Sequence, residues 1–321
     1  MTRARLSILL VVTGLVVAAC GAAEVLAPRL AVRDAARATA EQERSRFTLS
    51  LVGDDAAVTA LFDEGEPAGA DDAKALELLC DSRLTVTTDK AGAFGLDLQV
   101  GDVEHAFELR VIDGTLFFRG DAPDLARLFG AEPGELDAMV AGAREAGFGF
   151  VADAVAGRWL SADLSRFTEM AESAPVADTE RRAFLDAITK AWGEDVKVDR
   201  LDDDHYRLTV AIRQVYEHLV PLLGSLPGFP GAEMIPPAGE VPDKSVSAEV
   251  WVSDGKISRA ELDLAQFSET SAGRVALRVD ISSPDSALST PDDAVDIDLF
   301  KLIEPFIAGF AGALSGGMTT S

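Results

Sequence analysis

The chain has 321 residues, and its 54 acidic side chains outnumber the 29 basic ones, which gives a formal net charge of −25 at pH 7. A chain this acidic lacks the basic surface that binds nucleic acid, and anionic lipid headgroups would repel it. Its 48% of hydrophobic residues can bury a large core, in one big domain or two small ones.

The first predicted element is a signal peptide over residues 1–19. Arg3 and Arg5 precede an uncharged, mostly apolar stretch of 14 residues from Leu6 to Ala19. A helix needs about 20 apolar residues to span a bilayer. The stretch therefore has the form of a secretory signal and not of a transmembrane anchor.

A cysteine follows this stretch directly. Val17-Ala18-Ala19-Cys20 resembles the lipobox of bacterial lipoproteins, in which an apolar residue and two small residues precede the cysteine. The resemblance implies that the Cys20 sulfur receives a diacylglyceryl group and that cleavage leaves Cys20 as the first residue. Two acyl chains hold a protein firmly on a membrane, so we expect a lipid anchor on the outer face of the cytoplasmic membrane. The alternative is an ordinary secreted protein with a chance cysteine at its cleavage point.

Residues 20–29 are predicted as the lipidated cysteine and a short tether, and residues 30–321 as a single domain. Residues 30–44 are rich in alanine and charge, which favours a helix. Apolar and polar residues then alternate with the period of a β-strand over residues 47–51, 83–88, 94–100, 107–111 and 116–118. Asp113-Gly114 separates the last two of these segments and predicts a hairpin.

A predicted helical stretch separates these strands from a second group. Helices are expected over residues 122–129, 135–145, 148–156, 164–172 and 178–192, with a short extended segment over 159–164. The second group of strands covers residues 196–198, 206–212, 246–252, 257–264 and 274–281, with a further helix over 214–223 and a hairpin turn at Asp254-Gly255. Clean alternation indicates an antiparallel sheet with one apolar face. The predicted class is therefore α+β, with helices covering the apolar face of a curved sheet.

The histidines and cysteines do not form a recognisable catalytic or metal site. His105 is expected at a solvated strand edge, and His218 lies in a predicted helix. His205 follows the acidic turn Asp202–Asp204, which lacks the spacing of a calcium loop. Cys80 is expected to be a small buried hydrophobe. Because no P-loop, nucleophile elbow, HExxH or dinucleotide motif is present, we expect no enzyme, no catalytic residue, no metal and no cofactor.

Apolar side chains on the helices over residues 122–156 could line a cavity beneath the sheet. The candidates are Leu125, Leu128, Phe129, Met139, Val140, Phe148, Phe150 and Val151. The alternative is a solid core formed by the same residues. The C-terminal tail, residues 299–321, begins with an apolar segment too short to span a bilayer, which is expected as a helix packed on the sheet or as a lid near the cavity mouth.

Several segments resemble the actinobacterial LppX/LprG-type lipoproteins. They are the lipobox, RFTLSL, the hairpin LRVIDGTLFFRGD, RWLSADL, HYRLTV and VPDKSVSAEVWVSDGKISRAELDL. Beyond the lipobox, the resemblance covers roughly residues 30–285. The resemblance implies a LolA-like fold, which is a curved, incomplete antiparallel barrel with helices over an apolar concave side. The predicted helices over 131–157 and 165–192 and the C-terminal tail are longer than in typical members.

The function implied by this resemblance is to carry lipids or lipidated glycans in the cell envelope, in some members beside a membrane transporter. An apolar cavity binds acyl chains tightly and with little headgroup specificity, because each buried methylene contributes about 0.8 kcal/mol. A different interpretation is a non-enzymatic scaffold lipoprotein with a solid core that docks an envelope protein. The two interpretations differ in whether a continuous apolar cavity exists.

Overall fold

The structure is a computed structural model, and it describes residues 27–53, 57–58, 74, 77–131, 133–165, 196–214, 216–217, 239, 241–267 and 273–298. The chain divides into two compact units. Unit 1 comprises Met1–Thr85 and Ala174–Asp285, and unit 2 comprises Val86–Ser173 and Ser286–Ser321. Each unit combines helices with an open sheet, so the predicted α+β class is confirmed. The single domain over residues 30–321 stays a prediction.

Unit 1 is built on an antiparallel sheet with the strand order β1-β11-β10-β9-β8-β7. Its strands are β1 (Arg44–Gly53), β7 (Val196–Asp202), β8 (His205–Ala211), β9 (Ser245–Ser253), β10 (Lys256–Asp263) and β11 (Val275–Ser282). Each was predicted from alternation, with bounds that differ by a few residues. A short 3₁₀ helix, η3 (Leu264–Phe267), follows β10.

The core of unit 1 lies between this sheet and helix α2 (Ala27–Ala40). Small and branched side chains on one side of α2 meet the apolar side chains of β7 to β10 in a buried cluster: Val32, Ala35, Ala36, Val196, Tyr206, Leu208, Val250, Ile257 and Ala260. Thr39 also ties the helix to β10, because its hydroxyl accepts a hydrogen bond of 2.9 Å from the Ile257 amide and donates one of 2.8 Å to the Ala35 carbonyl. The predicted first helix is thus confirmed, with its start at residue 27.

Unit 2 has the strand order β12-β6-β5-β4-β3-β2, and the division between the units falls within β2. Its strands are β2 (Arg83–Asp89), β3 (Phe94–Val100), β4 (Val103–Ile112), β5 (Thr115–Gly120), β6 (Leu160–Asp163) and β12 (Val295–Asp296). The pairs from β3 to β6 are antiparallel, whereas β12 pairs with β6 in parallel. The sequence did not predict β12.

Both Asp-Gly turns form as predicted. Asp113 and Gly114 have φ values of 50° and 76°, and Asp254 and Gly255 have values of 51° and 71°. Two consecutive residues with positive φ make a type I′ turn, whose twist matches that of the flanking strands. These turns set the register of the hairpins β4–β5 and β9–β10.

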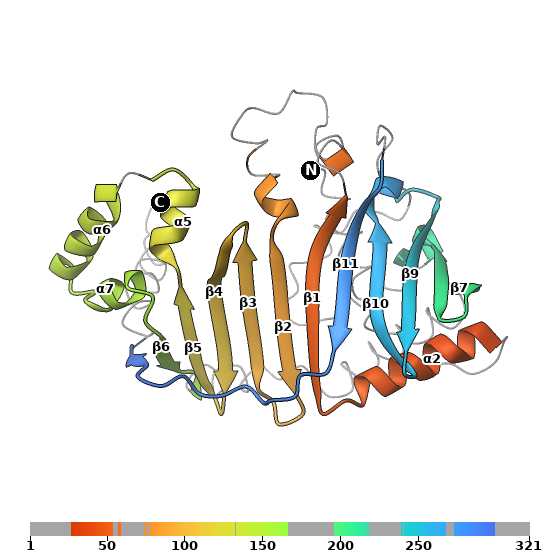
Figure 1. Cartoon of the computed structure of the whole chain (residues 1–321), viewed down its shortest axis with the longest axis horizontal. Helices are drawn as coiled ribbons and strands as arrows, with labels where there is room; N and C mark the ends of the chain where they lie inside the picture. Colours follow the sequence, from red (N-terminus) through yellow and green to blue (C-terminus); the bar gives the residue numbers. More distant parts are fainter. Residues whose placement is uncertain are drawn as a thin grey trace, which may run out of the picture. The chain divides into compact units, whose positions relative to one another are not determined.

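Three helices complete unit 2: α5 (Ala122–Leu128), α6 (Pro133–Glu145) and α7 (Phe150–Val155). Asp121 caps α5 by accepting a hydrogen bond of 3.0 Å from the Asp124 amide. Helix α5 contacts β4, α7 contacts β5 and β6, and α6 contacts the two other helices (Figure 1). Coverage of a concave face by these helices stays a prediction.

Several sequence-based predictions lie outside the described residues. They concern the signal peptide over 1–19, Cys20, most of the helical region 165–192, His218 and the C-terminal tail 299–321. Among the residues that are described, no helix has both the length and the apolar character needed to cross a bilayer.

Candidate functional site

Large apolar side chains line one face of the sheet in unit 2. Period-two alternation puts every second residue of a strand on the same face, and antiparallel pairing sets these residues opposite one another. One row across the sheet is Leu96, Leu109, Phe118 and Leu160, and the next is Phe94, Val111, Leu116 and Ala162. We call the eight residues of this face that lie on β3, β4 and β5 the apolar face of unit 2. They are Phe94, Leu96, Leu98, Phe107, Leu109, Val111, Leu116 and Phe118.

The apolar face is only partly buried, whereas the opposite face of the same strands includes fully buried positions. All eight side chains of the apolar face are half-buried. On the opposite face, in contrast, Glu108 and Phe117 are both only 6% exposed. An antiparallel sheet normally packs its apolar face and leaves its polar face to solvent. In unit 2 the apolar face of β3 to β5 is only half-buried, and the opposite face combines buried residues with half-buried ones such as Asp97, Arg110 and Arg119.

Residues distant in the sequence cover the opposite face. Leu288 lies over Gly95, where a Cβ atom would be 2.9 Å from the Leu288 Cδ2 atom. The Ser289 carbonyl accepts a hydrogen bond of 2.9 Å from Arg110 Nη1. The Trp159 ring stacks against Arg110, whose Cζ atom is 4.6 Å from the ring centroid. The segment that continues from β11 therefore packs on the polar side of the strands and leaves the apolar side free of this cover.

Unit 1 also has half-buried apolar side chains, on the strands β1 and β11 at one side of its sheet. Under α2 the apolar side chains are fully packed, with Val250 only 1% exposed. Farther across the sheet, three pairs of apolar side chains on β1 and β11 are half-buried: Phe47 with Ile281, Leu49 with Val279, and Leu51 with Leu277. Ile281, Leu277 and Leu51 pack against the buried clusters of unit 1, so these pairs form the partly accessible border of its core.

The eight cavity candidates from the sequence lie on or beside α5, α6 and α7. Six are half-buried: Leu125, Leu128, Val140, Phe148, Phe150 and Val151. Phe129 and Met139 are exposed, by 67% and 49%. The structure brings Phe148 and Phe150 together edge to face, with their ring centroids 6.2 Å apart, and packs Phe150 against the cluster around Leu160. Their role as the lining of a cavity stays a prediction.

Two cavities in the described part of the chain are lined by other residues. The one in unit 2 has a volume of about 380 Å³ and is lined by residues that include Glu104, His105, Arg119 and Asp121. The one in unit 1 has a volume of about 210 Å³ and is lined by residues that include Arg207, Glu249, Glu261 and Arg274. Ligand pockets for apolar molecules are lined mainly by apolar side chains, so the cavity in unit 1, whose lining is mainly charged, does not suit an acyl chain.

The two described histidines are each paired with carboxylates. His105 is solvated, with a side chain 53% exposed, and it lies beyond Phe107, the last residue of β4 in register with β5. His205 stacks on Trp251 with ring centroids 4.2 Å apart and lies 3.1 Å from Glu249 Oε2. The acidic turn before it is held by Arg200, which donates to the Asp203 carboxylate at 2.9 Å.

The apolar face of unit 2 was not identified as a site from the sequence. Its signal was present in the alternation of Phe94, Leu96 and Leu98, which predicted a strand. Which face would be covered depends on Leu288 and Ser289, which pack there from about 190 residues farther along the chain. No periodicity within β3 carries that information.

Comparison with known proteins assigns no family. No family model matches the chain, and no curated protein matches it. Among solved structures, the chain is similar to the crystal structure of the lipoprotein LppX of Mycobacterium tuberculosis, with 11% sequence identity and a TM-score of 0.32, over 82% of this chain and 97% of that one. At this identity and TM-score the likeness is distant, and it assigns neither family nor function.

Proposed function

We propose that this protein is a lipid-anchored lipoprotein of the cell envelope that binds the acyl chains of lipids or lipidated glycans and carries or presents them there. The observation that supports this most directly is the apolar face of unit 2, whose eight large side chains are half-buried while Glu108 on the opposite face is nearly buried. In this proposal the sheet is the curved, incomplete barrel of the LolA-like fold, and α5 to α7 border its concave side.

The energetics of acyl binding fit a surface of this kind. Apolar area removed from water contributes about 25 cal/mol per Å², and each buried methylene contributes about 0.8 kcal/mol. When an acyl chain lies along half-buried leucine and phenylalanine side chains, apolar area of both the acyl chain and the protein is removed from water, and both contribute to the binding free energy. Such binding depends on apolar area and needs no specific polar partner.

The lipid anchor and the net charge bear on two separate steps, attachment to the membrane and recognition of the lipid. A diacylglyceryl group on Cys20 would keep the protein at the membrane, since two acyl chains hold firmly. The formal charge of −25 gives the protein no electrostatic attraction to anionic headgroups. The cargo would therefore be recognised by its acyl chains and not by a charged headgroup.

The test compares two substitutions on β4 that point to opposite faces of the sheet. Leu109 lies at the centre of the apolar face, and Ile112 is a half-buried apolar residue of the opposite face. In L109Q an amide enters the proposed acyl site, and burying an amide without partners costs about 1–3 kcal/mol. We expect L109Q to weaken binding of a fluorescent fatty acid about tenfold, and I112Q to leave it within about twofold of the wild type.

Circular dichroism of both variants provides the control for folding. If both variants fold and both bind the fatty acid as the wild type does, the apolar face is not the acyl site. If I112Q weakens binding as much as L109Q, the effect is a general loss of stability, and the proposal loses its support from this face.

A second candidate function is that of a non-enzymatic scaffold which docks an envelope protein. The observation that favours it is the exposure of Phe129 and Met139, by 67% and 49%, at the α5 and α6 side of unit 2. Exposed apolar patches often mark protein interaction sites. A wild-type protein that binds no fatty acid in the assay above would favour this function over acyl binding.

A further inference from the structure

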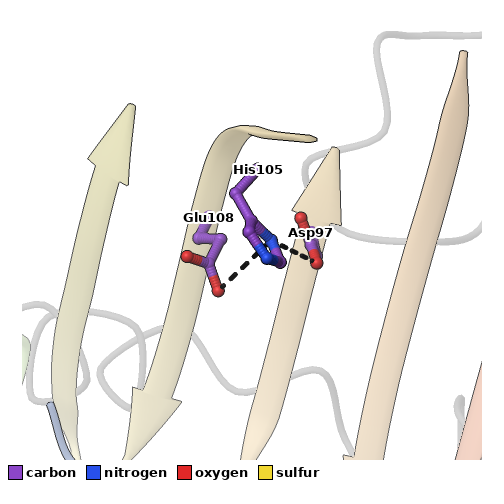
Figure 2. A group of neighbouring side chains, drawn as sticks. All are labelled: Asp97, His105 and Glu108. Carbon is purple, nitrogen blue, oxygen red and sulfur yellow. Dashed lines mark hydrogen bonds and ion pairs between the residues drawn. The ribbon is translucent and has the colours of Figure 1, made fainter. Parts of the chain in front are cut away.

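Three metal-ligating side chains meet on the polar face of unit 2. Figure 2 shows the imidazole of His105 between the carboxylates of Asp97 on β3 and Glu108 on β4. His105 Nδ1 lies 2.9 Å from Asp97 Oδ2 and 4.0 Å from Glu108 Oε1, and the ligand atoms of the three residues lie within 4.8 Å of one another. We propose that this cluster binds one divalent transition-metal ion of the zinc class.

A bulge in β4 places His105 in the cluster. The register between β3 and β4 shifts here, so that residues 104–106 of β4 stand opposite the single residue Gln99. His105 has a φ of 55°, a conformation that residues other than glycine seldom adopt. Bulges redirect side chains, and this one turns His105 toward Asp97 and Glu108, which already oppose each other across the two strands.

The spacing of the ligand atoms suits a tetrahedral ion. Nitrogen and oxygen ligands lie about 2.0–2.2 Å from zinc, so that two ligand atoms at tetrahedral angles are about 3.3 Å apart. The two distances from His105 Nδ1, 2.9 Å to Asp97 and 4.0 Å to Glu108, bracket this value. Side-chain shifts of less than about 1 Å would bring the three atoms around one ion.

Asp97 supplies an independent observation. The side chain as a whole is 36% exposed and its Oδ2 atom pairs with His105, but its Oδ1 atom is buried and has no hydrogen-bond partner among the described residues. A buried carboxylate oxygen without a donor is costly, and such a group is rare in native proteins. Bidentate coordination by Asp97, or rotation of its carboxylate, would use this oxygen to bind the ion.

The charges around Glu108 indicate which ion fits. Its side chain is 8% exposed, with Arg119 on Oε2 and Arg110 at 3.3 Å from Oε1, the oxygen that faces His105. The two arginines balance the two carboxylates, so that affinity depends on the imidazole. Ca²⁺ takes six to eight oxygen ligands, whereas zinc-class ions accept one nitrogen and two oxygens and leave a fourth position to water. Glu108 would also be oriented by Arg119 as an outer partner.

The experiment measures metal binding by the full chain in detergent, after treatment with a chelator, by titration with Zn²⁺ and by the visible absorption of Co²⁺. We expect one ion per chain for the wild type. H105N keeps a residue that tolerates positive φ but removes the imidazole, and D97N removes a carboxylate charge. Each should weaken binding at least tenfold. H205A, which removes the histidine paired with Glu249 in unit 1, is the matched control and should bind as the wild type does.

Thermal unfolding with and without Zn²⁺ is the second measurement, because an ion that binds only the folded state raises Tm. Zn²⁺ should raise the Tm of the wild type and of H205A but not that of H105N. Wild-type protein that binds no Zn²⁺, or H105N that binds it as tightly as the wild type, would overturn the proposal. Loss of binding in H205A equal to that in H105N would also overturn it. These outcomes are independent of fatty-acid binding, so they are distinguishable from failure of the proposed function.

Discussion

At the scale of single residues, Glu249 links charge, burial and stacking in unit 1. Burial raises the pKa of Glu249, but hydrogen bonds from Arg207 and His205, together with the charges of these two side chains, lower the pKa below its ordinary value of 4.5. Arg207 donates to Oε1 at 2.9 Å, and His205, stacked on Trp251, contacts Oε2 at 3.1 Å. The ionised carboxylate is thus the form that the folded state favours.

This lowered pKa predicts how stability depends on pH. A carboxyl whose pKa is lower in the folded state contributes stability above its unfolded value, here about 4.5, and the contribution is lost as the pH falls through the folded pKa. We therefore expect the free energy of unfolding of the wild type to fall more steeply than that of E249Q on acidification below about pH 4.5. Urea denaturation at a series of pH values measures both slopes.

A matched control is E145Q, which removes an exposed carboxyl at the end of α6. It should keep the wild-type slope over the same pH range. Equal slopes for the wild type and E249Q would mean that the contacts with Arg207 and His205 do not stabilise the folded state.

At the scale of elements, the attachment of α2 to β10 depends on one buried hydroxyl. Thr39 is 7% exposed, and its Oγ1 atom accepts the hydrogen bond of the Ile257 amide. Valine has the same shape but cannot accept this bond, and an unsatisfied buried amide costs about 1–3 kcal/mol. We expect T39V to lower the free energy of unfolding by that amount, as measured by urea denaturation.

Thr48 on β1 offers a comparison for this prediction. Its hydroxyl is half-buried and lies 3.4 Å from that of Thr85. Loss of this long contact in T48V should change the free energy of unfolding by no more than about 0.5 kcal/mol. If T39V were as stable as T48V, the tie between α2 and β10 would have no energetic role.

Elements with strong local signals were predictable from the sequence. The strand Phe94–Val100 has the bounds that alternation predicts, and both Asp-Gly hairpins form with type I′ turns. Helix α6 begins two residues before its predicted start. In each case the signal lies within the element, in side-chain period or in the φ that a turn residue can adopt.

Elements set by distant parts of the chain were not predictable. Strand β12 has two residues, too few for a period, and it forms because Val295 pairs in parallel with Leu160. The bulge that turns His105 toward Asp97 interrupts the alternation of β4 and leaves no periodic signal. The cover of the opposite face of β3 to β5 comes from Leu288 and Ser289. For the same reason the sequence did not show that this segment packs on the face opposite the apolar one.

At the scale of the whole molecule, Cys20 is predicted to decide where the protein resides. Cells fed labelled palmitate should incorporate the label into the wild type but not into C20A, because the Cys20 sulfur is the predicted acyl acceptor. C80A, which removes the other cysteine of the chain, should be labelled as the wild type is. Label in C20A, or its absence from C80A, would place the modification elsewhere and remove the argument for an anchor at Cys20.

The binding of acyl chains is the central claim for the molecule, and native mass spectrometry tests it most directly. The sample is residues 21–321, the mature chain without Cys20, secreted by an actinobacterial host through a cleavable signal peptide. The account predicts additional masses bound to the protein that disappear on organic extraction and that tandem spectra identify as acyl lipids. A bare polypeptide mass that takes up no added phospholipid or acylglycerol would contradict it.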